Sequence, residues 1–284
     1  MTIVEQGSGQ PLVLIPGLQG RWEYLRPTID ALAGHYRVVT FPLCDEPSAQ
    51  APYDEARALD NFVDQIRAAL DQLALTSAVI CGVSFGGIVA LRFAARHPER
   101  TSALILVSTP GPRWHLKRKH EIYSRVPWLL GPVFLAEAPW RLWREIGQAL
   151  PNGAARGRFV WTQLLALLRA PLSLSRMAAR ARMIGGSGRA EECRSVLAPT
   201  LVVHGEVWLD HVVSVDGTSE YGRLIKGAST LLLERTGHLG VMTHATEFAS
   251  RLHMFLESVS HIEAPRTFPE GVHARTRGDA DHAA

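Results

Sequence analysis

One serine lies in a pattern that suits nucleophilic chemistry. Ser84 stands in the run Gly82-Val83-Ser84-Phe85-Gly86, which is followed by a further glycine. The run joins an apolar segment, residues 77–82, to a segment with helical spacing, residues 85–96. So tight a strand-to-helix turn needs small residues around the serine, and it projects the hydroxyl at a helix N-terminus, where amide dipoles favour developing negative charge. We therefore interpret Ser84 as a nucleophile.

A serine hydroxyl needs a neighbouring base at neutral pH, and histidine is the usual one. Of the 12 histidines, His238 has the best placement. It follows the last apolar run, residues 230–234, and precedes the last helical segment, which puts it in a loop at the same sheet edge as Ser84. A carboxylate should orient its imidazole, and three candidates follow the preceding apolar run: Glu206, Asp210 and Asp216.

The elements that position these residues alternate along the chain. Near-continuous apolar runs predict strands, and stretches with helical spacing separate them. This alternation is typical of an α/β fold with a mostly parallel central sheet that has helices on both faces. The predicted strands are 11–15, 36–41, 77–82, 103–107, 200–204 and 230–234, and the predicted helices include 24–33, 54–73, 85–96 and 245–258.

The middle of the chain interrupts this rhythm. Residues 111–195 contain helical stretches but no obvious strand. Residues 113–182 carry 13 Lys and Arg against three acidic residues, and they hold five of the seven tryptophans. Such a shift in composition marks a separate module. We predict a core formed by residues 1–110 and 196–260, a helical insertion at 111–195, and a disordered tail at 261–284, which is rich in Pro, Gly, His and charge.

Composition limits the cellular setting. No apolar run reaches the roughly 20 residues of a membrane-spanning helix, and the N-terminus does not resemble a signal peptide, so we expect a cytoplasmic protein. The three cysteines are odd in number and widely spaced, which predicts reduced thiols rather than a disulfide framework or a metal site. A short basic run at 115–120 is not accompanied by a nucleic-acid-binding fold, so no nucleic-acid partner is expected.

Together these residues resemble the α/β-hydrolase superfamily, in particular its serine hydrolases with a helical cap after strand six. The resemblance covers residues 1–258. Members often read Gly-Glu-x-Asp-x-x-Val-Pro after the strand that precedes the acid, and here Gly205-Glu206-Val-Trp-Leu-Asp210-His-Val-Val-Ser214 matches with two additional residues. The resemblance thus implies that Asp210 is the acid, with Ser84 and His238 as its partners, in the chain order of this fold.

The resemblance also implies an oxyanion hole and a pocket. The amide after the nucleophile, on Phe85, and the amide of Leu18 would hold the oxyanion. Where the family usually has His-Gly-x, this chain has Pro16-Gly17-Leu18. Where many relatives have Gly-x-Gly-x-Ser, only Ser48 is retained. The pocket residues expected beneath the cap are Gln19, Trp114, Trp128, Trp140 and Leu239.

The implied activity is hydrolysis of a carboxylic ester of a small apolar or anionic substrate through an acyl-enzyme, with no cofactor and no metal. The same three residues also serve lactonases, thioesterases, acyltransferases and carbon–carbon bond hydrolases. A non-catalytic protein that binds a small ligand or a partner is the alternative of another class, motivated by Pro16, the altered loop before Ser48 and the longer run before Asp210. The basic cap admits three interpretations: solvated arginines over an aromatic pocket, inward arginines that bind an anion, or docking on an anionic membrane. The oligomeric state stays open.

Overall fold

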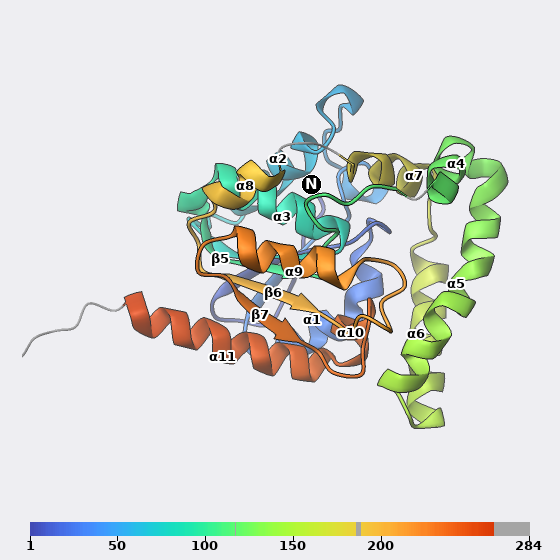
Figure 1. Ribbon diagram of the computed structural model, residues 1–284. Helices are drawn as coiled ribbons and strands as arrows, with labels where there is room; N and C mark the ends of the chain where they lie inside the picture. The colour runs from blue at the N-terminus through green and yellow to red at the C-terminus, as the bar shows by residue number, and fades with distance from the viewer. Residues whose placement is uncertain (117, 186–188, 264–284) are drawn as a thin grey trace, which may run out of the picture.

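A seven-stranded sheet forms the centre of the computed structural model, which describes all residues except 117, 186–188 and 264–284 (Figure 1). The strand order is β1-β3-β2-β4-β5-β6-β7, and every neighbouring pair is parallel except β1 with β3. The strands are β1 (Val4–Gln6), β2 (Pro11–Ile15), β3 (Arg37–Thr40), β4 (Ala78–Val83), β5 (Thr101–Val107), β6 (Thr200–His204) and β7 (Ser229–Leu232). The predicted α/β class is therefore confirmed.

Helices cover both faces of this sheet. The helices on one face are α2 (Asp60–Gln72), α3 (Phe85–Arg96), α8 (Arg189–Ser195) and α9 (Val215–Leu224). Those on the other are α1 (Arg26–Leu32), α10 (Gly240–Thr243) and α11 (Ala245–Glu263) (Figure 1). The predicted helices at 54–73, 85–96 and 245–258 correspond to α2, α3 and α11. Strand β1 was not predicted, because Glu5 is exposed, its two neighbours are only partly buried, and the segment shows no apolar run.

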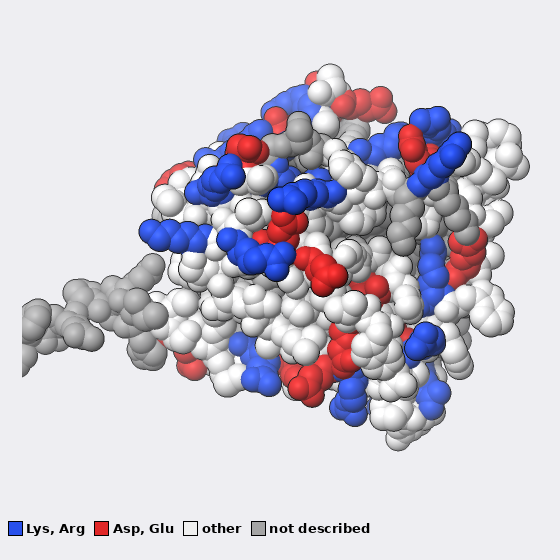
Figure 2. Space-filling model, in the orientation of Figure 1, with Lys and Arg blue, Asp and Glu red and all other residues white. Residues whose placement is uncertain are grey.

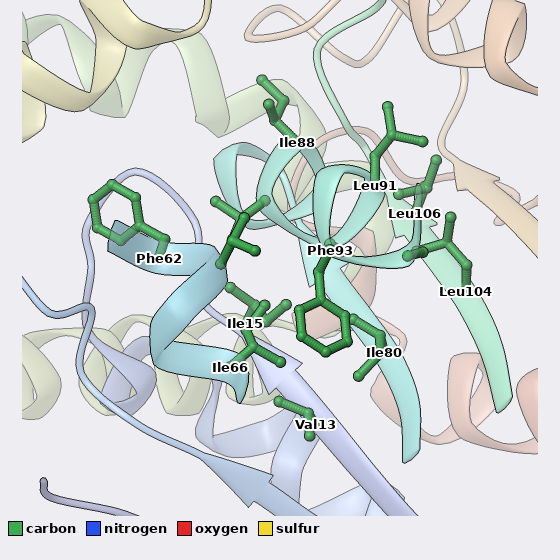
Figure 3. Packing of buried hydrophobic residues seen from close by; sticks show 14 of the residues in the cluster. Val13, Ile15, Phe62, Ile66, Ile80, Ile88, Leu91, Phe93, Leu104 and Leu106 are labelled. Atoms are coloured by element: carbon green, nitrogen blue, oxygen red, sulfur yellow. The ribbon is translucent and has the colours of Figure 1, made fainter. Parts of the chain in front are cut away.

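Apolar side chains of the strands pack between the two helical layers. On the α2 and α3 side, Val13, Ile80 and Leu106 of the strands meet Ile66 and Phe93 of the helices, and all of these side chains are fully buried (Figure 3). Burying one such side chain contributes about 1.5–3 kcal/mol, which makes this sheet a rigid support for the loops at its edge. All three cysteines, Cys44, Cys81 and Cys193, lie unpaired in this interior.

The insertion separates β5 from β6, so it follows the fifth strand of the described sheet, whereas the resemblance implied a cap after the sixth. It contains α4 (Arg118–Arg125), α5 (Pro127–Ala149), α6 (Gly153–Arg169), α7 (Leu174–Met183) and α8. Helices α4 to α7 stand beside the sheet as a separate layer, which we call the cap, whereas α8 returns to the core and packs against α3 (Figure 1). None of the described helices is long and apolar enough to cross a membrane. The prediction of a disordered tail from residue 261 is wrong for residues 261–263, which belong to α11, and residues 264–284 lie outside the described residues.

Candidate active site

The turn between β4 and α3 holds Ser84 in an unusual backbone conformation. Its φ of 54° and ψ of −118° lie outside the regions that non-glycine residues favour. Its amide donates to the carbonyl of Val107 on the neighbouring strand at 2.8 Å, so the sheet continues to the edge of the turn. Strained backbone of this kind persists where the surroundings dictate it and is frequent at functional sites. The serine thus lies at the carboxyl edge of the sheet, as predicted.

Close backbone approach explains the small residues around the serine. A β-carbon on Gly86 would collide with the carbonyl oxygens of Ile15 and Pro16, so α3 can begin directly against the end of β2 only with glycine there. The close packing of α3 against the end of β2 also brings the turn that follows β2 next to Ser84. A β-carbon on Gly17 would lie 3.4 Å from the Ser84 β-carbon.

Two backbone amides beside the serine are available to an incoming ligand. Among the described residues, the amides of Leu18 and Phe85 donate no hydrogen bond within the chain. The Phe85 amide opens α3, where the partial positive charge of the helix dipole is concentrated. The Leu18 amide belongs to the turn that closes with a 2.9 Å hydrogen bond from the Gly20 amide to the Gly17 carbonyl. Two free donors at this position can bind a developing oxyanion.

A buried arginine of the cap holds the Leu18 turn in place. Arg180 of α7 is fully buried and donates to the Leu18 carbonyl at 2.9 Å. Its guanidinium also forms a two-pronged ion pair with Asp45, at 2.9 and 2.6 Å, and a second pair with Glu46. A β-carbon on Gly20 would collide with this guanidinium, which accounts for glycine at that position. Sequence reasoning did not identify Arg180, although it shares a helix face with the buried Met177 and Ala181.

Removal of Arg180 should destabilise the protein strongly. In an Arg180→Met variant, Asp45 and Glu46 remain buried without the Arg180 guanidinium, Glu46 keeps only its pair with Arg176, and we expect the free energy of unfolding to fall by about 3–5 kcal/mol. Arg176→Met is the matched control, because Arg176 is partly exposed and forms one ion pair with Glu46 at 3.4 Å, which is worth at most about 1 kcal/mol. Chemical denaturation of both variants measures the difference, and equal losses would contradict this assignment.

His238 and Asp210 form a pair in the loops that follow β7 and β6, at the same edge of the sheet as Ser84. His238 follows β7 in the loop before α10, and its Nδ1 lies 3.4 Å from Oδ2 of Asp210, at the long end of the hydrogen-bond range. The second carboxylate oxygen of Asp210 accepts from the amides of Val212 and Val213 at 2.9 and 2.8 Å. These bonds leave Oδ2 free to face the imidazole. The structure therefore brings Asp210 and His238 together, as the resemblance implies.

The two alternative acids lie elsewhere. Glu206 accepts hydrogen bonds from the Arg235 amide, at 2.6 Å, and from the Trp208 indole. Asp216 is exposed in the first turn of α9. Neither carboxylate contacts His238, so Asp210 alone of the three candidates orients it. Within the described residues, no group of His, Cys, Asp and Glu side chains is placed to hold a metal ion.

Burial and charge oppose each other in this pair. Burial alone would raise the pKa of Asp210, but the charge of His238 and the hydrogen bonds to the carboxylate bring it below its usual value. For His238, burial alone would lower the pKa, but the charge of Asp210 and the shared hydrogen bond, together with the charge of Glu145, raise it above the usual value. The arrangement therefore stabilises the protonated imidazole beside an ionised Asp210.

A third acid near this pair comes from the cap. Glu145 lies near the end of α5 and is fully buried. Its Oε1 accepts hydrogen bonds from the amides of Gly237 and Leu239, at 2.9 and 2.5 Å, on either side of His238. No sequence pattern distinguished Glu145, which is one of only three acidic residues between positions 113 and 182.

The predicted pocket residues divide into two groups. Trp114 packs against the buried cluster that contains Phe85, and Leu239 is half-buried next to His238, whereas Gln19 is exposed in the Leu18 turn. Trp128 and Trp140 are 77% and 86% exposed. The prediction that these two tryptophans line the pocket is therefore wrong for this structure.

The turn of α5 explains this error. At 100° per residue, Trp128, Trp140 and Trp143 fall on one side of the helix, and Glu145 falls on the opposite side. The face that carries Glu145 is directed to the core, and much of the right-hand edge of the molecule over α5 and α6 accordingly has neither acidic nor basic side chains (Figure 2). A groove between these helices is lined by Trp143, Arg156, Val160, Trp161 and Leu164, together with two glycines.

Known proteins resemble this chain in sequence. The model of the alpha/beta hydrolase family matches residues 12–251. A 2-hydroxymuconate semialdehyde hydrolase of Pseudomonas sp. (strain CF600) is 28% identical over 261 residues, which cover 89% of this chain and 88% of that protein. A pimeloyl-[acyl-carrier protein] methyl ester esterase of Aliivibrio salmonicida is 24% identical, with coverage of 89% and 94%.

A solved structure gives the same result for the fold. The enol-lactonase from Burkholderia xenovorans LB400 superposes with a TM-score of 0.73 at 20% sequence identity, over 90% of this chain and 96% of its own. At that identity the likeness concerns the fold alone. The family match covers most of the chain. It includes the turn of Ser84, the loop of Asp210, the loop of His238 and the cap. The chain belongs to the alpha/beta hydrolase family.

Proposed function

We propose that the protein is a serine hydrolase that cleaves a carboxylic ester through an acyl-enzyme on Ser84. The observation that carries this proposal is the turn at Ser84, where a serine at positive φ lies beside two unoccupied amide donors, those of Leu18 and Phe85. Donors fixed before the reaction stabilise the charge that develops on a carbonyl oxygen, and one such donor is worth roughly 3 kcal/mol. The curated relatives named above are both hydrolases.

The proposed reaction has two halves. His238 accepts the Ser84 proton while the serine oxygen attacks the substrate carbonyl, and the Leu18 and Phe85 amides hold the oxyanion. The carbon–oxygen bond of the ester then breaks, and His238 donates its proton to the leaving alcohol. Water, deprotonated by His238, next attacks the acyl-enzyme and releases the acid and Ser84. Asp210 keeps the imidazole in the tautomer whose Nε2 accepts the proton.

The buried arginines favour an apolar substrate over an anionic one. Arg180 and Arg189 are the buried arginines of the described insertion. Arg180 is engaged by two carboxylates, and Arg189 donates to the carbonyls of Pro112 and Ile184. Both guanidinium groups are therefore already bound within the chain, which leaves neither free to bind a substrate carboxylate.

A second candidate substrate class comes from two relatives. The 2-hydroxymuconate semialdehyde hydrolase is one, and a 2-hydroxy-6-oxo-2,4-heptadienoate hydrolase of Pseudomonas putida is 31% identical over 114 residues. Both names describe unsaturated carboxylates with a second carbonyl group. Attack by Ser84 on the oxo carbonyl of the keto tautomer would break the adjacent carbon–carbon bond, and His238 would pass the Ser84 proton to the departing carbon; water would then release the acid from Ser84 as in ester hydrolysis.

A substrate panel tests the proposal. Wild type and Ser84→Ala are assayed with p-nitrophenyl esters of increasing chain length, a thioester, a lactone and an unsaturated oxo-carboxylate. We expect the wild type to hydrolyse short apolar esters fastest, with activity lost in Ser84→Ala. Equal hydrolysis by both proteins, or no turnover of any compound by the wild type, would contradict it. Added alcohols or amines show whether an acceptor other than water takes the acyl group.

A further inference from the structure

A carboxylate of the cap contacts the loop that carries the proposed base. Glu145 lies on the core-facing side of α5, and α5 packs against α10, which begins directly after the His238 loop. Its side chain is fully buried, where an isolated carboxylate is costly. Its position in the interior therefore needs a specific interaction to stabilise it.

The interaction is a pair of hydrogen bonds on both sides of His238. Oε1 of Glu145 accepts from the Gly237 amide at 2.9 Å and from the Leu239 amide at 2.5 Å. Gly237 is confined from the other side as well, because a β-carbon there would collide with the backbone of Leu209 and Asp210. The peptides around the histidine are thus held between the cap and the Asp210 loop.

The second oxygen of the same carboxylate, unlike the first, accepts no hydrogen bond from the described part of the chain. Oε2 of Glu145 is buried and has no hydrogen-bond partner among the described residues. The charged groups that act on this carboxyl are His238 and Asp210. Burial raises the pKa of Glu145 to about 7, against the opposing effects of the Leu239 and Gly237 amides and of His238. If Glu145 served only to hold α5 against the core, its second oxygen would be buried without a partner at a cost in stability that a fully paired or apolar residue would avoid.

We propose that Glu145 is a positioning residue for His238, through which the placement of cap helix α5 controls the geometry and charge of the base. This inference rests on the proposed role of His238. With α5 in the observed position, Glu145 holds both peptides that flank the imidazole and, as the pH rises through its pKa of about 7, adds a negative charge near it. Displacement of α5 removes both effects, so the base is fully positioned only under a closed cap.

Two variants separate these effects. Glu145→Gln keeps an oxygen that accepts from Gly237 and Leu239 but removes the charge, whereas Glu145→Leu removes both. We expect the glutamine variant to retain kcat within about threefold, with the acidic limb of kcat/KM moved to lower pH, because the nearby charge that raises the pKa of His238 is gone. We expect the leucine variant to lose about 10- to 100-fold in kcat with little change in KM, since small displacements of a catalytic group cost this much.

A cap variant remote from His238 provides the control. Arg182 of α7 donates to the Ser124 carbonyl of α4, so Arg182→Met removes a hydrogen bond of the cap that involves neither α5 nor the His238 loop. We expect it to keep the wild-type pH limb and most of kcat. The inference is overturned if the pH limb of Glu145→Gln coincides with that of the wild type, or if Glu145→Leu loses no more kcat than Arg182→Met. If Glu145→Leu does not fold, the test rests on the acidic limb of kcat/KM in Glu145→Gln, compared with that of the wild type.

The role of Ser84 is judged separately in the same assay. If Ser84→Ala retains activity, the proposed function fails whatever the Glu145 variants do. If Ser84→Ala is inactive while Glu145→Gln and Glu145→Leu match the wild type, only the positioning role fails.

Discussion

Ser84→Ala is expected to lower kcat by at least about 10⁴-fold, with KM changed only slightly. The variant removes the oxygen that attacks the carbonyl but leaves the Leu18 and Phe85 amides in place, so binding and part of the oxyanion stabilisation persist. Steady-state hydrolysis of the best ester from the panel measures the effect.

The matched control for this variant is Ser108→Ala. Ser108 also has a positive φ, 43°, and it follows β5 at the same edge of the sheet. It is 3% exposed, and its alanine variant should keep kcat within a few-fold. If Ser84→Ala retained more than a tenth of the wild-type kcat, or if Ser108→Ala lost as much, Ser84 would not be the nucleophile.

Asp210→Asn is expected to lower kcat by about 10³- to 10⁴-fold. The asparagine oxygen can still accept from the Val212 and Val213 amides, which turns its NH₂ group toward Nδ1 of His238. That nitrogen must then accept a hydrogen bond, so the proton resides on Nε2, the atom that has to receive the proton of Ser84. Asp216→Asn, on the exposed first turn of α9, should behave as the wild type.

The pH profile gives a second measure of the Asp210–His238 pair. The base must be neutral, so activity is lost as the pH falls through the pKa of His238, which the charge of Asp210 raises above its ordinary value of 6.5. The acidic limb of kcat/KM should therefore lie above pH 6.5 in the wild type and at lower pH in Asp210→Asn. Equal limbs in the two proteins would contradict the pairing.

The sheet and its edge could be predicted because their determinants are local. Strands β4, β5 and β6 are continuous apolar runs, and the carboxyl ends of parallel strands meet at one edge of the sheet. These two features are sufficient to predict that Asp210 and His238 lie close together and that the Ser84 turn lies at the same edge. The two additional residues before Asp210 are accommodated in a turn in which the Leu209 and Asp210 amides donate to the backbone carbonyl of Glu206.

The cap could not be predicted to the same depth. Helix α5 carries tryptophans and other apolar residues around much of its circumference, so its sequence does not show which face meets the core, and Trp128 and Trp140 were assigned to the wrong one. The burial of Arg180 depends on Asp45, which lies 135 positions earlier in the chain. The burial of Glu145 depends on the amides of Gly237 and Leu239, which lie 92 and 94 positions later in the chain. Contacts of this kind leave no local pattern.

Covalent labelling with a fluorophosphonate tests the central claim most directly, because this electrophile reacts with serines that an adjacent base has activated and needs no knowledge of the substrate. Intact-mass measurement and peptide mapping are carried out on wild type, Ser84→Ala and Ser108→Ala. We expect a single adduct on the peptide that contains Ser84 in the wild type and in Ser108→Ala, and none in Ser84→Ala. An unlabelled wild type, or a Ser84→Ala variant labelled as fast as the wild type, would contradict the central claim.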